Sequence, residues 1–76
     1  MSFQAYLDTI RIRTGQSPDD FRAYANWQGY LDGEKLKPTV KAGTIIADLQ
    51  RDFGLGRGHA MAIYALLTGH KKEGDA

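Results

Sequence analysis

The stretch that decides the fold is Phe53-Gly54-Leu55-Gly56-Arg57-Gly58-His59-Ala60, which places three glycines between two apolar patterns. The upstream pattern consists of Ile45, Ile46, Leu49 and Phe53, and the downstream pattern of Ala60, Ile63, Tyr64 and Leu67. Both patterns repeat at the three- and four-residue spacing of a helix. Because glycine permits positive φ and a close approach of backbone to backbone, the stretch predicts two helices joined in a tight hairpin.

The residues after the turn form a candidate anion-binding site. The first amides of a helix have no intrahelical acceptor, and together with the helix dipole they attract negative charge. We predict that the second helix of the hairpin begins near Arg57 or Gly58, so the free amides run from Gly56 to His59. We therefore expect these four residues to bind a phosphate group. The Arg57 guanidinium adds charge-assisted hydrogen bonds, and Lys41 from the main connecting loop supports them.

The glycines of the turn have different explanations. Gly54 is explained by ending the upstream helix in a left-handed conformation. Gly56 and Gly58 are not, because a helix start prefers a polar cap. Two explanations stay open for them: close packing of the hairpin, or the approach of a ligand. His59 also has two, as a neutral capping or hydrogen-bonding residue at a helix start that disfavours its protonated form, or as a ligand contact.

Capping signals and apolar spacing predict helices at residues 3–14, 18–28, 40–53 and 57–68. The clearest start is Ser17-Pro18-Asp19-Asp20, which combines an N-cap, a proline at the first helical position and acids in the first turn. That helix ends at Gly29 or frays on to Gly33, and we favour Gly29. The third helix takes Thr39 as its N-cap or starts later, at Gly43 or Thr44.

The chain is therefore expected to be all-α, a compact four-helix domain spanning residues 1–76, with the first two helices packed across the last two. The nearly all-apolar run 60–67 marks the fourth helix as the central one, or as a dimer face. The loop 32–41 reads as ordered, the tail 70–76 as frayed, and no segment has the period of a strand.

Most aromatic residues fall on the apolar faces of the predicted helices and are assigned to the core. They are Phe3, Tyr6, Phe21, Tyr24, Trp27 and Tyr64. Tyr30 is the aromatic residue that we expect to be exposed beside lysines, at Lys35 and Lys37, as base stacking would require. Ile12 lies off the apolar stripe of its helix, either as an ordinary exposed residue or as a contact for a partner.

Composition narrows the classes of function. The 76 residues carry a net charge of +1 and no cysteine, so general electrostatics favour neither nucleic acid nor membrane, and cysteine-ligated zinc is excluded. The longest uncharged apolar run, residues 60–67, is far short of the roughly 20 residues that span a bilayer. With no secretory signal visible, we expect a cytoplasmic protein without membrane contact.

We expect no cofactor, no metal and no enzymatic activity. His59 and His70 have no nearby partners in a ligand pattern, and the recognisable catalytic motifs are absent. A core this small also leaves little room for a buried pocket.

The pattern Leu49-x3-Phe53-Gly54-Leu55-Gly56-x3-Ala60-x2-Ile63 resembles the helix-hairpin-helix motif over about fifteen residues. The resemblance implies that the first amides of the second helix grip a nucleic-acid phosphate without reading base sequence.

Over nearly its full length the chain is similar to a bacterial family known as domain of unknown function 4287. The residues that carry this resemblance are Phe3-x2-Tyr6-Leu7, Thr14-Gly15, Ser17-Pro18, Phe21, Lys41-Ala42-Gly43 and the run Phe53-Gly54-Leu55-Gly56-x-Gly58-His59-Ala60-Met61-Ala62. It implies a stand-alone or appended helical module with no established activity.

Two hypotheses of function follow. In the first, the chain binds the phosphate backbone of nucleic acid through Gly56 to His59. In the second, it is a protein-interaction or self-association module, binding a protein partner or forming a homodimer. The second rests on the apolar fourth helix and on Ile12, and in it the glycines of the turn are purely structural.

Overall fold

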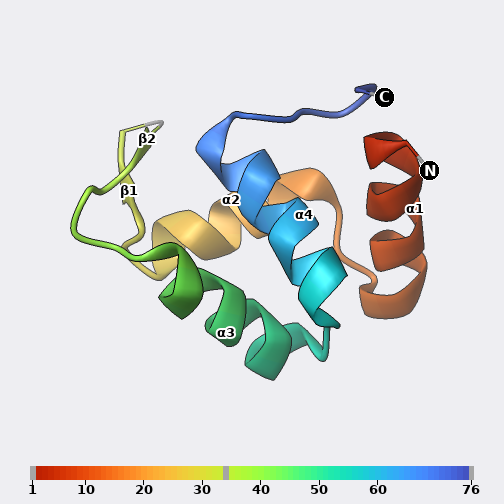
Figure 1. The fold of residues 1–76 in the computed structure, drawn as a ribbon, viewed down its shortest axis with the longest axis horizontal. Helices are drawn as coiled ribbons and strands as arrows, with labels where there is room; N and C mark the ends of the chain where they lie inside the picture. The colour runs from red at the N-terminus through yellow and green to blue at the C-terminus, as the bar shows by residue number, and fades with distance from the viewer. Residues whose placement is uncertain (1, 34, 76) are drawn as a thin grey trace.

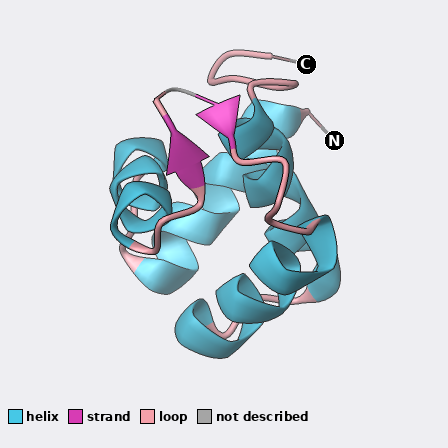
Figure 2. Cartoon of the chain, turned by 90° about the vertical axis from the view of Figure 1, so that its left-hand side faces the viewer, coloured by secondary structure: helices cyan, strands magenta, loops and turns pink. Residues whose placement is uncertain are grey.

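The computed structural model describes residues 2–33 and 35–75, and within them the fold is mostly helical (Figure 1). Its elements, in chain order, are α1 (Phe3–Thr14), α2 (Pro18–Trp27), β1 (Leu31–Asp32), β2 (Lys35–Leu36), α3 (Ala42–Phe53) and α4 (Arg57–Thr68). The prediction of four helices in an all-α class is confirmed. The one addition is a small strand pair at one end of the molecule, drawn in magenta in Figure 2.

Local chemistry sets the limits of α1 and α2. The Ser2 hydroxyl accepts a hydrogen bond from the first turn of α1, and Ser17 and Asp20 form a reciprocal capping box at the start of α2. Gly29 has a φ of +80° and ends α2 as predicted. The amide of Tyr30 then donates to the carbonyl of Ala25, so the chain turns back on the helix that it leaves.

Helix α3 begins later than the predicted residue 40. The amide of Val40 donates to the carbonyl of Lys37, which closes a turn over the segment that contains Thr39. Thr39 therefore lies in a turn and is not the N-cap. The helix starts at Ala42, and its N-cap is Lys41, whose side chain makes no capping hydrogen bond.

The antiparallel pair of β1 and β2 was not predicted from the sequence. Leu31 pairs with Leu36, and Asp32 pairs with Lys35. Two-residue strands are too short to show the alternation by which strands are recognised. Opposite charges face each other at Asp32 and Lys35, and the pairing continues in the hydrogen bond from the Lys37 amide to the Tyr30 carbonyl.

Helix α4 lies at the centre and packs against α1, α2, α3 and β2, as its apolar circumference predicted (Figure 1). The largest fully buried side chains come from all four helices: Ile10, Phe21, Ile45, Leu49 and Ile63. A single apolar cluster therefore joins the four helices.

Two aromatic assignments were wrong. Trp27 is 85% exposed although it was assigned to the core, and Tyr30 is 5% exposed although it was expected at the surface. Trp27 lies two residues after the buried Ala25, which places it roughly 200° around the helix from that face. Tyr30 is carried inward by the reversal at Gly29. Ile12, off its helical stripe, is 85% exposed.

The tail, which the sequence suggested is frayed, is held over its described residues 70–75. The guanidinium of Arg22 donates to both carboxylate oxygens of Glu73, at 2.6 and 2.9 Å. The amide of Gly74 donates to the side-chain oxygen of Gln4 at 2.8 Å, and the amide of Gln4 donates to the Asp75 carbonyl at 3.3 Å. These bonds fasten the tail to α1 and α2, and bring the two ends of the chain near each other (Figure 1).

Candidate functional site

The start of α4 presents unpaired backbone donors. Gly56 is the N-cap, in an extended conformation, and no side chain caps the helix there. Its carbonyl accepts the amide of Ala60 at 2.9 Å, which is the first regular bond of the helix. Among the described residues no backbone carbonyl accepts the amides of Arg57, Gly58 or His59. These three amides are therefore available to an outside acceptor.

The glycines of this turn serve different purposes. Gly54 has a φ of +66° and needs to be glycine for that conformation. Gly56 and Gly58 do not have positive φ, and a Cβ atom added at either position would meet no atom within 4 Å. Neither backbone strain nor close packing within this chain accounts for these two glycines. The space beside the free amides is open.

The side chains around the turn differ in their contacts. Arg57 is exposed and forms no ion pair within the described part of the chain. The ring of His59 meets the ring of Tyr6 edge-on, with centroids 5.8 Å apart, so His59 packs against α1. Lys41 is not brought to the turn. It lies at the opposite end of the twelve-residue helix α3, which is roughly 18 Å long.

Two acids of α3 are occupied by other side chains. Arg51 pairs with Asp48 at 3.2 Å and with Asp52 at 2.9 Å. Tyr24 donates a hydrogen bond to Asp52 at 2.5 Å, and Tyr30 donates to Asp48. The hydrogen bonds from Arg51 and Tyr24 lower the pKa of Asp52. Burial raises the pKa of Tyr24 to about 12, with help from its bond to Asp52. This cluster ties α2 and the segment after it to α3.

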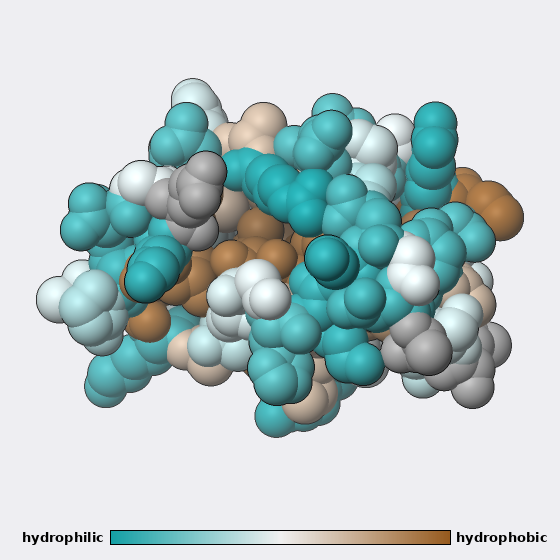
Figure 3. Space-filling model, turned by 90° about the horizontal axis from the view of Figure 1, so that it is seen from above, coloured by the Kyte–Doolittle hydropathy of each residue, from teal (hydrophilic) through white to brown (hydrophobic). Residues whose placement is uncertain are grey.

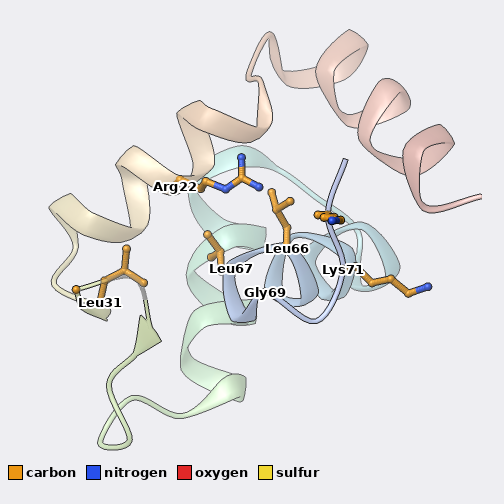
Figure 4. A pocket seen from close by; sticks show the side chains of 8 residues that line it. Arg22, Leu31, Leu66, Leu67, Gly69 and Lys71 are labelled. Carbon is orange, nitrogen blue, oxygen red and sulfur yellow. The ribbon is translucent and has the colours of Figure 1, made fainter. Parts of the chain in front are cut away.

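Sequence reasoning missed a cleft that lies between α2, β1, α4 and the tail. Its volume is about 480 Å³, and its lining residues are Arg22, Leu31, Gly33, Leu66, Leu67, Gly69, Lys71 and Lys72 (Figure 4). Figure 3, seen from above the tail, shows apolar surface in a hollow among hydrophilic side chains. Because these residues come from four separate segments, no spacing in the sequence could reveal the cleft.

The described residues offer neither a metal site nor a membrane-spanning helix. In the described residues, no three His, Cys, Asp or Glu side chains gather where they could hold a metal ion. None of the described helices combines the length and the apolar character needed to cross a membrane.

The fold and these sites define a small, mostly helical domain that offers free helix amides and a cation-bordered cleft. The chain belongs to the family described as Domain of unknown function (DUF4287), whose model matches residues 2–69. The family resemblance seen in the sequence is thereby confirmed. The resemblance of the turn to a helix-hairpin-helix motif stays a prediction.

The chain is also similar to part of two curated proteins. Both are named sulfite reductase [NADPH] hemoprotein beta-component, one from Nitrobacter winogradskyi and one from Nitrobacter hamburgensis. Each is 41% identical over 56 residues, which are 71% of this chain and 9% of the relative. The chain thus spans about a tenth of the length of these relatives. No solved structure matches the chain significantly.

Proposed function

We propose that this chain is a non-enzymatic binding module that holds a phosphate of a nucleic-acid backbone at the start of α4. One observation carries the proposal. Gly56 and Gly58 leave open space beside three unpaired amides, although neither φ nor packing requires glycine there. A phosphate that approaches this end of the helix would accept hydrogen bonds from Arg57, Gly58 and His59 and interact favourably with the helix dipole.

The charges near the turn support an anionic ligand. Arg57 is exposed and without an ion pair among the described residues, so its guanidinium is available to phosphate oxygens. Asp48 and Asp52, the acids closest to the turn in sequence, are paired with Arg51, which reduces their repulsion of an anion. Backbone amides contact phosphate without reading bases, so the expected binding is independent of base sequence and weakens with salt.

The relatives are consistent with an accessory role. In the two Nitrobacter proteins the similar segment is 9% of a chain named as a reductase hemoprotein component. A segment that forms so small a part of a long chain fits a module that adds a contact better than one that performs the reaction.

Amide NMR on labelled protein tests the proposal. Inorganic phosphate, a short single strand and a short duplex are titrated at low and high salt. We expect salt-sensitive shifts of the Arg57, Gly58 and His59 amides. Shifts with phosphate and none with either nucleic acid would limit the site to small anions, and no shift at low salt would overturn it.

A pair of glycine variants sharpens the same test. Gly58→Ala places a methyl group beside the free amides, whereas Gly43→Ala places one in equally open space at the start of α3. We expect Gly58→Ala to weaken phosphate binding and Gly43→Ala to leave it unchanged. Equal binding by both variants would mean that the open space at Gly58 does not serve a ligand.

A second candidate function, association with a protein partner or a second copy, is favoured by Trp27 and Ile12. Each of these large apolar side chains is 85% exposed, and tryptophan is enriched at the energetic centres of interfaces. In this case the turn is structural. Sedimentation over a range of concentrations tests self-association, and a strictly monomeric mass would count against the homodimer.

A further inference from the structure

The cleft between α2, β1, α4 and the tail is separate from the start of α4 and combines two kinds of surface. Leu31, Leu66 and Leu67 supply apolar surface, while Arg22, Lys71 and Lys72 carry positive charge. Figure 4 shows the Arg22 side chain reaching from α2 toward α4, where Leu66 and Leu67 lie. The volume of about 480 Å³ is in the range of small-molecule sites.

The charged side chains that line the cleft determine which charge a ligand should carry. Three of the eight lining residues are cations, and one of them, Arg22, is paired with Asp19 and Glu73. A ligand that takes the place of Glu73 therefore meets a lining whose charge favours an anion over a metal ion. Lys72 forms no ion pair with any described residue. The three leucines add apolar surface that an inorganic anion would leave exposed to water. The lining therefore favours a ligand with both an anionic head and an apolar body.

Arg22 shows which head group this site accepts. Its two terminal nitrogens hold the two oxygens of Glu73 at 2.9 and 2.6 Å, the paired geometry by which arginine binds a carboxylate. Glu73 belongs to the tail and its side chain is 43% exposed, so a competing carboxylate can reach the same guanidinium. The Glu73 carboxylate thus occupies the place that the head of a ligand would take.

We propose that the cleft binds a small amphipathic anion, whose apolar body covers Leu31, Leu66 and Leu67. Its head displaces Glu73 from Arg22, in the cleft that Lys72 also lines. A fatty carboxylate and an alkyl sulfonate share this chemistry. The site is independent of the phosphate site, because its α4 residues, Leu66 and Leu67, lie in the last turn of that helix, whereas Arg57, Gly58 and His59 lie in its first turn.

Amide NMR with octanoate tests the site, at concentrations below those at which octanoate forms micelles. Octanesulfonate provides a second anionic head, octanol removes the charge, and acetate removes the apolar body. We expect octanoate and octanesulfonate to shift the amides of Leu31, Leu67 and Lys72, and octanol and acetate to bind at least about tenfold more weakly. Equal binding of octanol, or no shift with octanoate, would overturn the proposal.

Three charge variants identify the groups that act. Glu73→Gln removes the competing carboxylate and should tighten octanoate binding roughly twofold to fivefold, the range of one exposed ion pair. Lys72→Gln should weaken it by a similar factor. Arg13→Gln removes a charge from α1, outside the cleft, and should leave it unchanged. If octanoate binds both cleft variants as it binds the unaltered protein, the proposed head-group position is wrong.

The tests of the two proposed sites have separate readouts, so either site can be disproved without the other. Octanoate reports on the amides of Leu31, Leu67 and Lys72, whereas phosphate and nucleic acid report on the amides of Arg57, Gly58 and His59. Folding of each variant is checked by its far-ultraviolet circular dichroism and its unchanged amide spectrum outside the cleft.

Discussion

The hydroxyl of Tyr30 donates a hydrogen bond to the carboxylate of Asp48, which lies 18 residues further along the chain. This bond ties the segment after α2 to the middle of α3. Beside it Tyr24 donates to Asp52 at 2.5 Å, and Arg51 contacts both acids. The rings of Tyr24 and Tyr30 also meet edge-on, with centroids 6.1 Å apart. Asp48 and Asp52 are thereby held by Arg51 and by two tyrosines, and the tyrosines pack in or against the core.

Tyr30→Phe should lower the free energy of unfolding by about 1–2 kcal/mol, because the variant keeps the buried ring but removes a hydrogen bond to a charged group. Urea unfolding followed by circular dichroism measures the change. Tyr64→Phe is the matched control, since the Tyr64 hydroxyl has no hydrogen bond within the described residues, and it should change stability little. Equal effects of the two variants would show that the bond to Asp48 contributes nothing.

Stability should fall at alkaline pH because of Tyr24. Burial, aided by the bond to Asp52, raises its pKa from 10.0 to about 12. Between these values the unfolded chain has lost the proton that the folded chain keeps, so stability is fully present below pH 10 and declines as pH rises toward 12. Thermal unfolding across this range measures the decline. Tyr24→Phe should make it shallower, and an unchanged slope would contradict the assignment.

The ion pair between Arg22 and Glu73 should open at acid pH. Hydrogen bonds from Arg22 lower the pKa of Glu73 from 4.5 to about 2, so its contribution is present above pH 4.5 and is lost as pH falls toward 2. Because the ion pair is at the surface, we expect it to open without global unfolding, while the bonds of Gln4 to Gly74 and Asp75 keep the tail in place. The amide shift of Glu73 reports the opening. Glu73→Gln should remove this transition, and a transition that persists in the variant would contradict the assignment.

Alanine at two glycines should have opposite effects on stability. Gly54→Ala forces alanine into a φ of +66° and should cost about 1 kcal/mol. Gly43→Ala lies inside α3, meets no atom within 4 Å and should add about 0.5–1 kcal/mol. Urea unfolding of the two variants side by side measures both. If both variants change the free energy of unfolding in the same direction, the positive φ at Gly54 does not require glycine.

Trp27→Ala should change the free energy of unfolding by less than about 0.5 kcal/mol, because the side chain is 85% exposed. Phe21→Ala, on the buried face of the same helix, should instead cost about 3–5 kcal/mol. If the chain self-associates through Trp27, its sedimentation should become monomeric in the variant. A large loss of stability would show that Trp27 packs within the chain.

Much of the fold was predictable because its signals are local. Ser17 and Asp20 cap the helix that they begin, and Gly54 ends the helix before it, so each limit depends on a few neighbouring residues. The start of α3 at Ala42 falls between the two predicted starts, because the turn over Thr39 prevents a cap at that residue. The amides after Gly56 were also predictable, since every helix start leaves them unpaired. Lys41 lies away from these amides because the whole length of α3 separates it from the turn.

By itself, the sequence determined the four helices, the glycine conformations that end them and the family to which the chain belongs. The helices and their glycine ends depend on contacts within a few residues, and the family on a match that runs over residues 2–69. Only the tertiary structure decided that Trp27 faces solvent, that Tyr30 is buried against α3 and that Glu73 fastens the tail to Arg22, 51 residues earlier. The cleft beside that ion pair also forms only in the tertiary structure. Burial and long-range pairing depend on which segments meet after folding, and the spacing of residues within a segment does not contain this information.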